Sequence, residues 1–364
     1  MTMDEEKYNH YMSIIGKSSY NRQDHWDIFD TLYYDKISNF NSMASFRTNG
    51  ISNMLETGLP SQERKSALLG SHYDVDYSQQ EKCELIKRFN ELKAMLGQDV
   101  RKIKFNSEIG NPRNYLHLDN GDKYFLNFDD LYHVYSAWQI KRSVKHLLGD
   151  FSSYNILEIG AGYGNLAHKI KNIYKKSRYV IVDLPEVLLI QHYYLSKSNP
   201  SYKIVNLLDY DLKDESVGDI DYDFLLVPFG VYKDLNIKFD IAINTRSFGE
   251  MPKNILHDYF EWVQNNIKDR GLFYTTNRYV FTKSLDKNKI RDYPFDDFWN
   301  VVISQPQWLQ THLHEFMLQR SAMKPQVPLN FMLESFPIST PPPGPIMVEI
   351  QTQTEWLKHQ KGNK

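Results

Sequence analysis

Hydrophobic and polar residues follow two alternating periods along residues 155–198. Apolar residues run through Asn155–Ile159 and again through Tyr179–Asp183. Between them, Asn165–Lys176 places its apolar residues at helical spacing, and Pro185 stands at an early position of a second helix. Short apolar runs separated by helical segments are typical of parallel strands joined by helices. The pattern therefore predicts an α/β core.

The same alternation continues towards residue 320. Further strands are predicted at Lys203–Leu207, Phe239–Asn244 and Leu272–Thr276, and a short strand at Phe224–Val227 stays an open alternative. A helix follows Pro252 and is broken by Gly271. The segments Trp299–Ser304 and Leu313–Arg320 are candidates for a closing antiparallel pair.

Residues 1–105 have helical periodicity and lack glycine-rich strand turns. Leu85, Phe89, Leu92 and Leu96 share one face of a predicted helix over Glu81–Leu96. We therefore predict a helical N-terminal extension over 1–105, which would serve as a lid or as a dimerisation surface. The α/β domain then covers 106–325, and a proline-containing tail covers 326–364.

A glycine-rich turn follows the strand at Asn155–Ile159. Gly160, Gly162 and Gly164 are spaced by two residues each, and Asn165 stands where a dinucleotide-binding turn would have its third glycine. Glu158 precedes the turn, and Asp183 ends the second strand. This Glu-x-Gly-x-Gly-x-Gly pattern resembles the first motif of the class I S-adenosylmethionine (SAM) dependent methyltransferases. A different nucleotide, or a turn that binds nothing, remains the alternative.

This resemblance implies a Rossmann-like class I methyltransferase fold, with a mostly parallel seven-stranded sheet and helices on both faces. It also implies SAM as the cofactor. Asp183 would accept hydrogen bonds from the ribose, and Asp209 from the adenine amino group unless it is only a turn residue or helix cap. Residues at the carboxyl ends of the strands are the cofactor-binding candidates: Glu158, Gly160, Ala161, Gly162, Gly164, Asp183, Leu184, Leu208, Asp209 and Asn244. On the helix predicted at Phe128–Leu148 and just before it, Tyr115, Tyr132, Tyr135 and Gln139 are candidates to border the cofactor.

The segment from Asn244 to Pro252 is the densest polar cluster that follows a strand, although it also reads as a solvated loop before a helix. A hydroxyl becomes a good nucleophile when a base removes its proton, and Glu250 is our first candidate for that base. His257 and Arg246 are the other catalytic candidates. Arg246 and Arg278 would bind an anionic group of a substrate, or serve only as ion-pair partners.

His312 and His314 would face the same side of the last predicted strand, a spacing that suits a metal ion. No cysteine or acidic cluster accompanies them in the sequence, so we predict no metal site.

Three further segments resemble the bacterial sugar O-methyltransferases of polysaccharide gene clusters. They are Ile109–Pro112, Leu157–Gly164 with Val182–Glu186, and Asn244–Met251 with Thr276–Tyr279. The resemblance covers roughly 105–320 and implies methyl transfer to a hydroxyl of a nucleotide sugar or glycan. Plant-type small-molecule O-methyltransferases place a histidine base shortly after the fourth strand, whereas this chain has Phe248-Gly249-Glu250 there. A small-metabolite acceptor and a non-catalytic SAM-binding partner protein are the alternatives.

Composition limits the partners and the compartment. The net charge of −2, with no basic stripe, argues against nucleic acid as the substrate. One cysteine, Cys83, allows no disulfide within the chain and fits a reducing compartment. No apolar run is long enough to span a membrane, and the first residues do not form a secretory signal. We expect a cytoplasmic enzyme that acts on a sugar or glycan and pairs as a homodimer through its N-terminal extension.

Overall fold

The computed structural model of this chain describes residues 3–17, 37–47, 79–97, 108–112, 115–117, 123–151, 153–209, 220–281 and 288–338. It divides into two compact units. Unit 1 holds the described residues up to 141 together with 151–237, and unit 2 holds 142–150 and 238–338. The proline-rich segment from Ser339 onwards and the Asn120-Gly121 turn lie outside the described residues.

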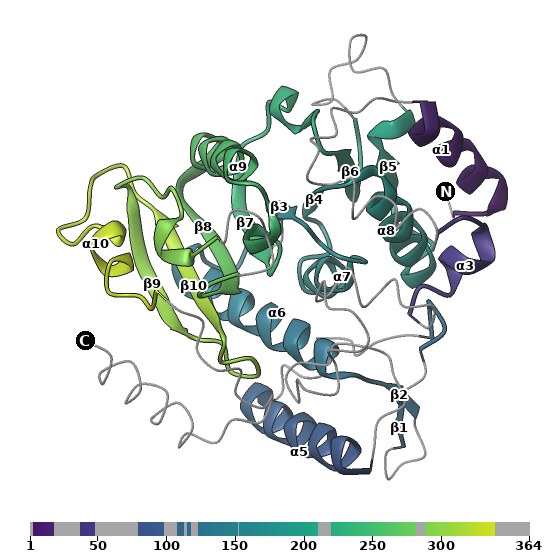
Figure 1. Cartoon of the computed structure of the whole chain (residues 1–364), viewed down its shortest axis with the longest axis horizontal. Coiled ribbons are helices and arrows are strands. Elements are labelled where there is room, and N and C mark those ends of the chain that lie inside the picture. Colours follow the sequence, from purple (N-terminus) through teal and green to yellow (C-terminus); the bar gives the residue numbers. More distant parts are fainter. Residues whose placement is uncertain are drawn as a thin grey trace. The chain divides into compact units, whose positions relative to one another are not determined.

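Four parallel strands form the sheet of unit 1 (Figure 1). They are β3 (Asn155–Ile159), β4 (Arg178–Asp183), β5 (Ile204–Asn206) and β6 (Phe224–Pro228), in the spatial order β5-β6-β4-β3. Their side chains are almost all buried, as expected for parallel strands that are covered on both faces. Burial on both faces of the sheet explains why these strands are continuous apolar runs in the sequence.

Helices connect these strands. α7 (Asn165–Ile173) follows the glycine-rich turn, and α8 (Pro185–Ser198) begins with proline, whose missing N–H costs nothing at a first helical position. α6 (Phe128–Leu147) precedes β3, and the short 3₁₀ helix η3 (Leu207–Asp209) follows β5. A further 3₁₀ turn, η5, covers Tyr232–Asp234.

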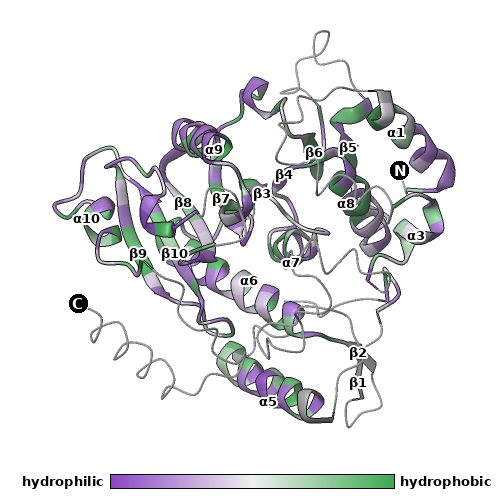
Figure 2. Cartoon of the chain, in the orientation of Figure 1, coloured by the Kyte–Doolittle hydropathy of each residue, from purple (hydrophilic) through white to green (hydrophobic). Residues whose placement is uncertain are grey.

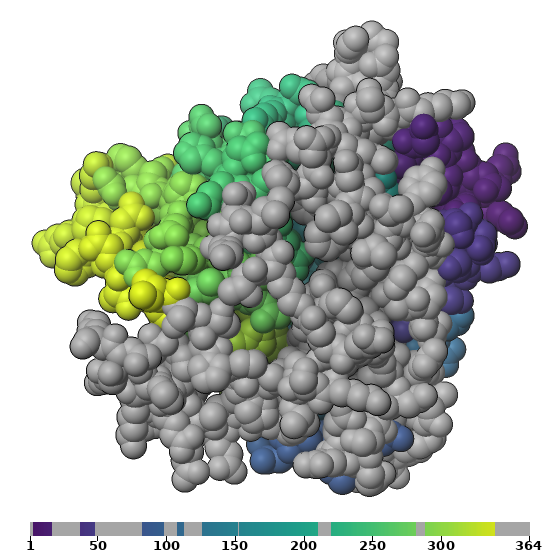
Figure 3. All heavy atoms as spheres, in the orientation of Figure 1, coloured from purple at the N-terminus to yellow at the C-terminus, as the bar shows by residue number. Residues whose placement is uncertain are grey.

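The N-terminal region is helical in the parts that the structure describes. It contains α1 (Glu5–Lys17), α3 (Phe40–Ala44) and α5 (Gln79–Leu96), and a small antiparallel pair follows, β1 (Tyr115–His117) with β2 (Lys123–Phe125). α1 contacts α8, α3 and η3, and Figure 3 shows atoms of α1 and α3 side by side at the surface. Hydrophobic and hydrophilic residues alternate around α5 in Figure 2, and the predicted face of this helix is buried. The helical prediction is confirmed, and the roles as lid or dimer surface remain predictions.

Unit 2 contains the second group of strands, in the spatial order β7-β8-β10-β9. β7 (Phe239–Thr245) is parallel to β8 (Ile267–Arg278), and β10 (Leu313–Arg320) is antiparallel to both β8 and β9 (Trp299–Pro306). The predicted closing antiparallel pair is confirmed. The helices of this unit are α9 (Lys253–Asn266), α10 (Leu329–Leu333), and the 3₁₀ turns η6 (Phe248–Glu250) and η7 (Ile290–Asp292).

The Rossmann-like α/β prediction is confirmed, with two differences of detail. The described residues contain one more sheet strand than the seven expected, because Phe224–Pro228 is a full strand. β8 also begins at Ile267, so the helix ends before Gly271 rather than at it. Arg270 has a positive φ of 61°, and a Cβ on Gly271 would lie 2.9 Å from the Lys268 carbonyl oxygen. Glycine therefore permits an irregular strand at this point.

Asp209 fixes α1 to the sheet side of unit 1. Its carboxylate accepts a hydrogen bond from the Tyr11 hydroxyl at 2.7 Å and forms ion pairs with Lys7 at 3.5 Å and His10 at 3.3 Å. The backbone N–H of Met3 donates to the Ser196 hydroxyl on α8. Within the described part of the chain, no helix is long and apolar enough to cross a bilayer.

Replacing Asp209 with Ala should loosen α1, because one carboxylate receives three groups from that helix. We expect a loss of ~1 kcal/mol, since these contacts are partly exposed to solvent. The measurement is the melting temperature together with the rate of proteolytic cleavage near residue 17. Asp221→Ala, which removes an exposed ion pair with Lys203, is the control. Equal cleavage rates for the two variants would contradict this anchoring role.

Candidate functional site

The glycine-rich turn and Asp183 meet at the carboxyl end of β3 and β4. All three glycines have positive φ, with Gly162 at 57° and Gly164 at 92°. The backbone N–H of Ala161 donates a hydrogen bond to Asp183 Oδ2 at 3.1 Å, and Gly160 N–H donates to the Val182 carbonyl at 3.0 Å. The sequence motif thus forms a single structure in which the turn is tied to the acid.

Asp183 is held by three hydrogen-bond donors. Besides Ala161, the N–H of Leu184 donates to Oδ1 at 2.9 Å, and Gln191 Nε2 donates to Oδ2 at 2.6 Å while also donating to the Gly162 carbonyl at 2.8 Å. Desolvation raises the pKa of Asp183 to about 7, although these donors act in the opposite direction. A carboxylate has about four acceptor positions. One position is therefore left for a ligand hydroxyl, whereas two ribose hydroxyls were expected.

Glu158 is fully buried on β3. Its Oε2 accepts a hydrogen bond from the Tyr179 hydroxyl at 2.7 Å, and its Oε1 has no hydrogen-bond partner among the described residues. Desolvation raises the pKa of Glu158 to about 8. A buried carboxyl of this kind is mostly protonated at neutral pH, and a cationic group placed beside it would favour the ionised form.

Asn165 connects the glycine-rich turn to α6, a role that the sequence did not indicate. Its amide donates to Asp130 Oδ1 at 2.9 Å, and its Oδ1 accepts from the Tyr194 hydroxyl at 3.3 Å. Arg47, from the N-terminal region, lies 3.6 Å from Asp130 Oδ2, and both side chains are fully buried. These partners are far apart in sequence, so no spacing pattern could have revealed them.

Leu208 and Asp209 lie further from Asp183 than the order of the strands along the sequence suggests. β6 is inserted between β4 and β5, so β5 is not the neighbour of β4. Phe229, directly after β6, donates its N–H to the Asp183 carbonyl at 2.8 Å. Asp183 is therefore paired with Pro228 on the adjacent strand and bonded to Phe229 just beyond it, and the Asp209 carboxylate instead binds α1.

A buried amide network lies at the carboxyl ends of β7 and β8 in unit 2. Asn244 donates to the Ser247 hydroxyl at 2.6 Å and accepts from Asn277 at 2.9 Å, and Asn277 also donates to Thr275 at 2.8 Å. Asn244, a candidate for cofactor binding, is fully buried. In this structure its polar atoms hold together the loop that follows β7.

Glu250 stands at the end of η6, in the loop after β7. Desolvation raises the pKa of Glu250 to about 7, while the positive charges of Arg278 and Arg246 oppose the rise. The side chain of Asn288 donates hydrogen bonds to the carbonyl groups of Gly249 and Met251, one on each side of Glu250. Asn288 was not among the candidates from the sequence, and only the fold shows that it fixes this turn.

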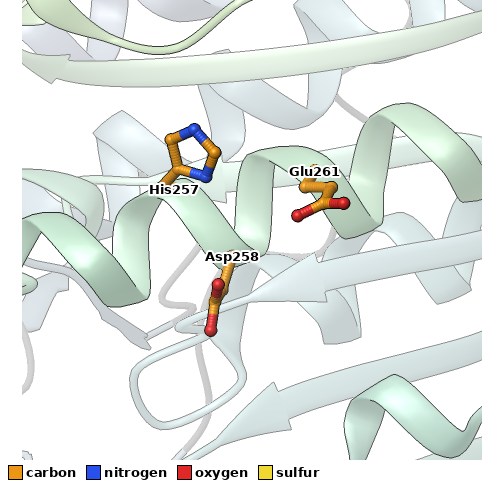
Figure 4. Close-up of side chains that lie close together, drawn as sticks. All are labelled: His257, Asp258 and Glu261. Atoms are coloured by element: carbon orange, nitrogen blue, oxygen red, sulfur yellow. The ribbon is translucent and has the colours of Figure 1, made fainter.

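The candidate histidines His257 and His314 lie on different elements, α9 and β10. His257 is exposed on α9, where its ring and the carboxylates of Asp258 and Glu261 have ligand atoms within 4.8 Å of one another. Figure 4 shows His257 and Asp258 on one turn and Glu261 on the next. His314 is buried, and its two ring nitrogens lie 2.9 Å from the Tyr279 and Ser304 hydroxyls. Both nitrogens of His314 therefore already have polar partners.

Arg246 and the aromatic candidates complete the list. Arg246 directly follows β7 with a positive φ of 66°, and its N–H donates to the Thr276 carbonyl at 2.7 Å. On α6, Tyr132, Tyr135 and Gln139 are buried, and Gln139 donates to the Tyr135 hydroxyl at 3.1 Å. The side chain of Tyr115 lies outside the described part of the chain.

No protein-family model and no curated protein sequence matches this chain. Its fold is similar to many solved structures. One is the pyocyanin biosynthetic protein PhzM, at 13% identity over 52% of this chain and 54% of that chain, with a TM-score of 0.35. Two others are TrmN from Thermus thermophilus (8% identity, 50% and 48% coverage, TM-score 0.34) and the SAH-bound magnesium protoporphyrin IX methyltransferase ChlM from Synechocystis PCC 6803 (10% identity, 65% and 100% coverage, TM-score 0.35). The chain spans about half the length of the first two. These likenesses are weak, so the functional proposal rests on the residues described above.

The buried carboxyl of Glu158 should make stability depend on pH. The pKa of Glu158 rises from 4.5 to about 8 on folding, so its neutral form favours the folded state below pH 4.5 and this contribution is lost as pH rises to 8. Glu158→Gln should therefore gain stability relative to wild type as pH rises from 5 to 8, by at most ~1.4 kcal/mol per pH unit. Chemical denaturation across this range measures the difference. A constant difference would show that Glu158 titrates normally, and Glu261→Gln on the surface of α9 is the control.

Proposed function

We propose that this chain is a SAM-dependent O-methyltransferase that transfers a methyl group to a hydroxyl of a sugar. The observation that carries the proposal is the hydrogen bond from the glycine-rich turn to Asp183. It places a glycine-rich turn beside an acid at the carboxyl end of a parallel strand, the position where open α/β sheets bind nucleosides. The pairing of turn and acid supports a nucleoside cofactor more strongly than the glycines alone.

The details of the turn favour SAM over a dinucleotide. Asn165 holds α6 through Asp130 at the position where a pyrophosphate site has glycine, and it presents a side chain in place of the close backbone approach. Glu158 is a buried acid two residues before Gly160. An acid near a sulfonium and an ammonium group is electrostatically favourable, whereas an acid near a pyrophosphate is not.

Within unit 1, we assign cofactor binding to the turn residues Gly160, Ala161, Gly162 and Gly164, together with Glu158, Asp183 and Leu184. Phe229 takes the place that Leu208 and Asp209 had among the sequence candidates, because it directly follows β6 and its N–H donates to the Asp183 carbonyl. Its ring would stack on the adenine, and a backbone carbonyl would accept a hydrogen bond from the adenine amino group.

Glu250 is our candidate for the base. The acceptor hydroxyl would give its proton to the Glu250 carboxylate as its oxygen attacks the methyl carbon in line with the sulfur. The carbon–sulfur bond then breaks, the electron pair stays on sulfur, and S-adenosylhomocysteine is released. A base whose pKa is about 7 suits this transfer near neutral pH.

The sugar acceptor is supported by the resemblance of three segments to sugar O-methyltransferases, as given in the sequence analysis. A small metabolite with a hydroxyl group fits Glu250 equally well. Transfer of label from methyl-tritiated SAM to fractionated cell extract separates these alternatives. Label in nucleotide sugars or glycans supports the proposal, and label only in other metabolites, protein or RNA contradicts it.

Asp183→Ala should weaken SAM binding at least ~10-fold, because a hydrogen bond to a charged group contributes roughly 1.5–3 kcal/mol. Asp209→Ala is the matched control, an acid that also follows a strand of the same sheet but binds α1. Isothermal titration with SAM gives both dissociation constants. A loss of affinity in Asp209→Ala with none in Asp183→Ala would reverse our assignment.

Glu250→Gln should lower kcat roughly 100-fold or more on the labelled acceptor and leave SAM affinity unchanged, because a positioned general base typically contributes 10²–10⁴-fold. In wild type, kcat/KM should rise with pH through about 7, since the carboxylate must be ionised to accept the proton. Initial rates from pH 5.5 to 8.5 test both statements, with Glu261→Gln as control. Full activity of Glu250→Gln would exclude Glu250 as the base.

A further inference from the structure

Four residues of unit 2 form what we call the Glu250 cluster: Arg246, Glu250, Arg278 and Tyr293. Arg246 follows β7, and Arg278 is the last residue of β8. These strands are parallel neighbours, with Thr245 paired to Thr276, so both arginines come from the same edge of the sheet. Glu250 belongs to the η6 turn between β7 and α9, and Tyr293 directly follows η7.

The backbone of Arg246 is held in a conformation that arginine rarely adopts. Its φ of 66° lies in the left-handed region, where residues other than glycine typically cost ~1 kcal/mol or more. The hydrogen bond from its N–H to the Thr276 carbonyl fixes this geometry against β8. Strained backbone that the surroundings hold in place is concentrated at functional sites.

Among the described residues, the charges that act on the Glu250 carboxyl are positive and come from Arg278 and Arg246. The three residues are half-buried. Glu250 loses its own negative charge when it accepts a proton during the reaction, while the two arginines keep their positive charges. A negative group on a bound ligand would stabilise this arrangement at both stages.

Tyr293 adds a buried hydroxyl to the cluster. Its side chain is 3% exposed, and its hydroxyl has no hydrogen-bond partner among the residues that the structure describes. Phe248 and Phe260 hold its ring, with centroid distances of 6.1 and 5.5 Å. The charge of Glu250 also reaches Tyr293. A buried hydroxyl without a partner costs free energy that an oxygen-rich ligand would recover.

From these observations we infer that the acceptor is an anionic sugar, whose carboxylate or phosphate binds Arg246 and Arg278 while a neighbouring hydroxyl faces Glu250. This inference rests on the proposed function and names the class of its acceptor. Arginine suits the role because its planar donors match carboxylate and phosphate oxygens in pairs. Tyr293 then donates to, or accepts from, a second oxygen of the same sugar.

The test is equilibrium binding to the full chain saturated with S-adenosylhomocysteine. The probes are methyl β-D-glucuronide, UDP-glucose and methyl β-D-glucoside, of which only the last is neutral. We expect at least one anionic probe to bind ~10-fold or more tightly than the glucoside, as one charge-assisted contact would give. The glucuronide or UDP-glucose arm shows whether a carboxylate or a phosphate is preferred.

Arg246→Gln and Arg278→Gln should each reduce this preference, and Lys268→Gln should keep it. Lys268 is a cation at the opposite end of β8, where it pairs with Asp240 at 2.7 Å. Circular dichroism and melting temperatures verify that each variant is folded. For a variant that fails to fold, Arg→Lys at the same position keeps the charge but removes the paired donors, and it should retain only part of the preference.

The inference is overturned if no anionic probe binds, if the glucoside binds equally well, or if the preference persists in both arginine variants. Failure of the proposed function has a different signature. In that case the anionic probe binds in an arginine-dependent way, but incubation with SAM and the anionic fraction of cell extract yields no methylated product.

Discussion

The hydrogen bond between the Ala161 N–H and the Asp183 carboxylate joins the two parts of the cofactor motif. A backbone donor can reach the acid only if the turn has no side chain in the way and adopts positive φ. This hydrogen bond therefore depends together on the three glycines, the end of β4 and the start of α7. Gln191 extends it, because one amide group binds both the acid and the turn. A ligand at this edge meets a surface that is already organised before it arrives.

The loop after β7 in unit 2 is organised differently. Here side-chain amides add to the backbone hydrogen bonds: Asn244 and Asn277 join the strand ends, and Asn288 holds the carbonyls on each side of Glu250. Amide groups carry no charge, so they fix the loop without competing with the arginines for Glu250. A carboxylate that is positioned by neutral groups keeps its own charge available for proton transfer.

Most of the fold followed from the sequence because its signals were local. The buried strands, the glycine-rich turn and the acid after β4 each lie within a few residues of one another. The spatial order of the strands had no such local signal. Nothing in the sequence of Phe224–Pro228 shows that this strand is inserted beside β4, and that insertion moves Asp209 away from Asp183. Asn288 and Tyr293 were missed for the same reason, since their contacts with η6 join segments that are far apart in the sequence.

The left-handed backbone of Arg246 bears on how this position would respond to selection for stability. Glycine is the residue that such a conformation favours, and it would relieve the strain at the start of the loop. Under the ligand-binding role that we infer for Arg246, the demands of folding and of ligand recognition differ at this position. A search for variants with higher melting temperature would be drawn to glycine at residue 246, and it would remove one guanidinium of the Glu250 cluster in doing so. At residue 246, a change that raises the melting temperature would thus weaken the acceptor binding that we infer.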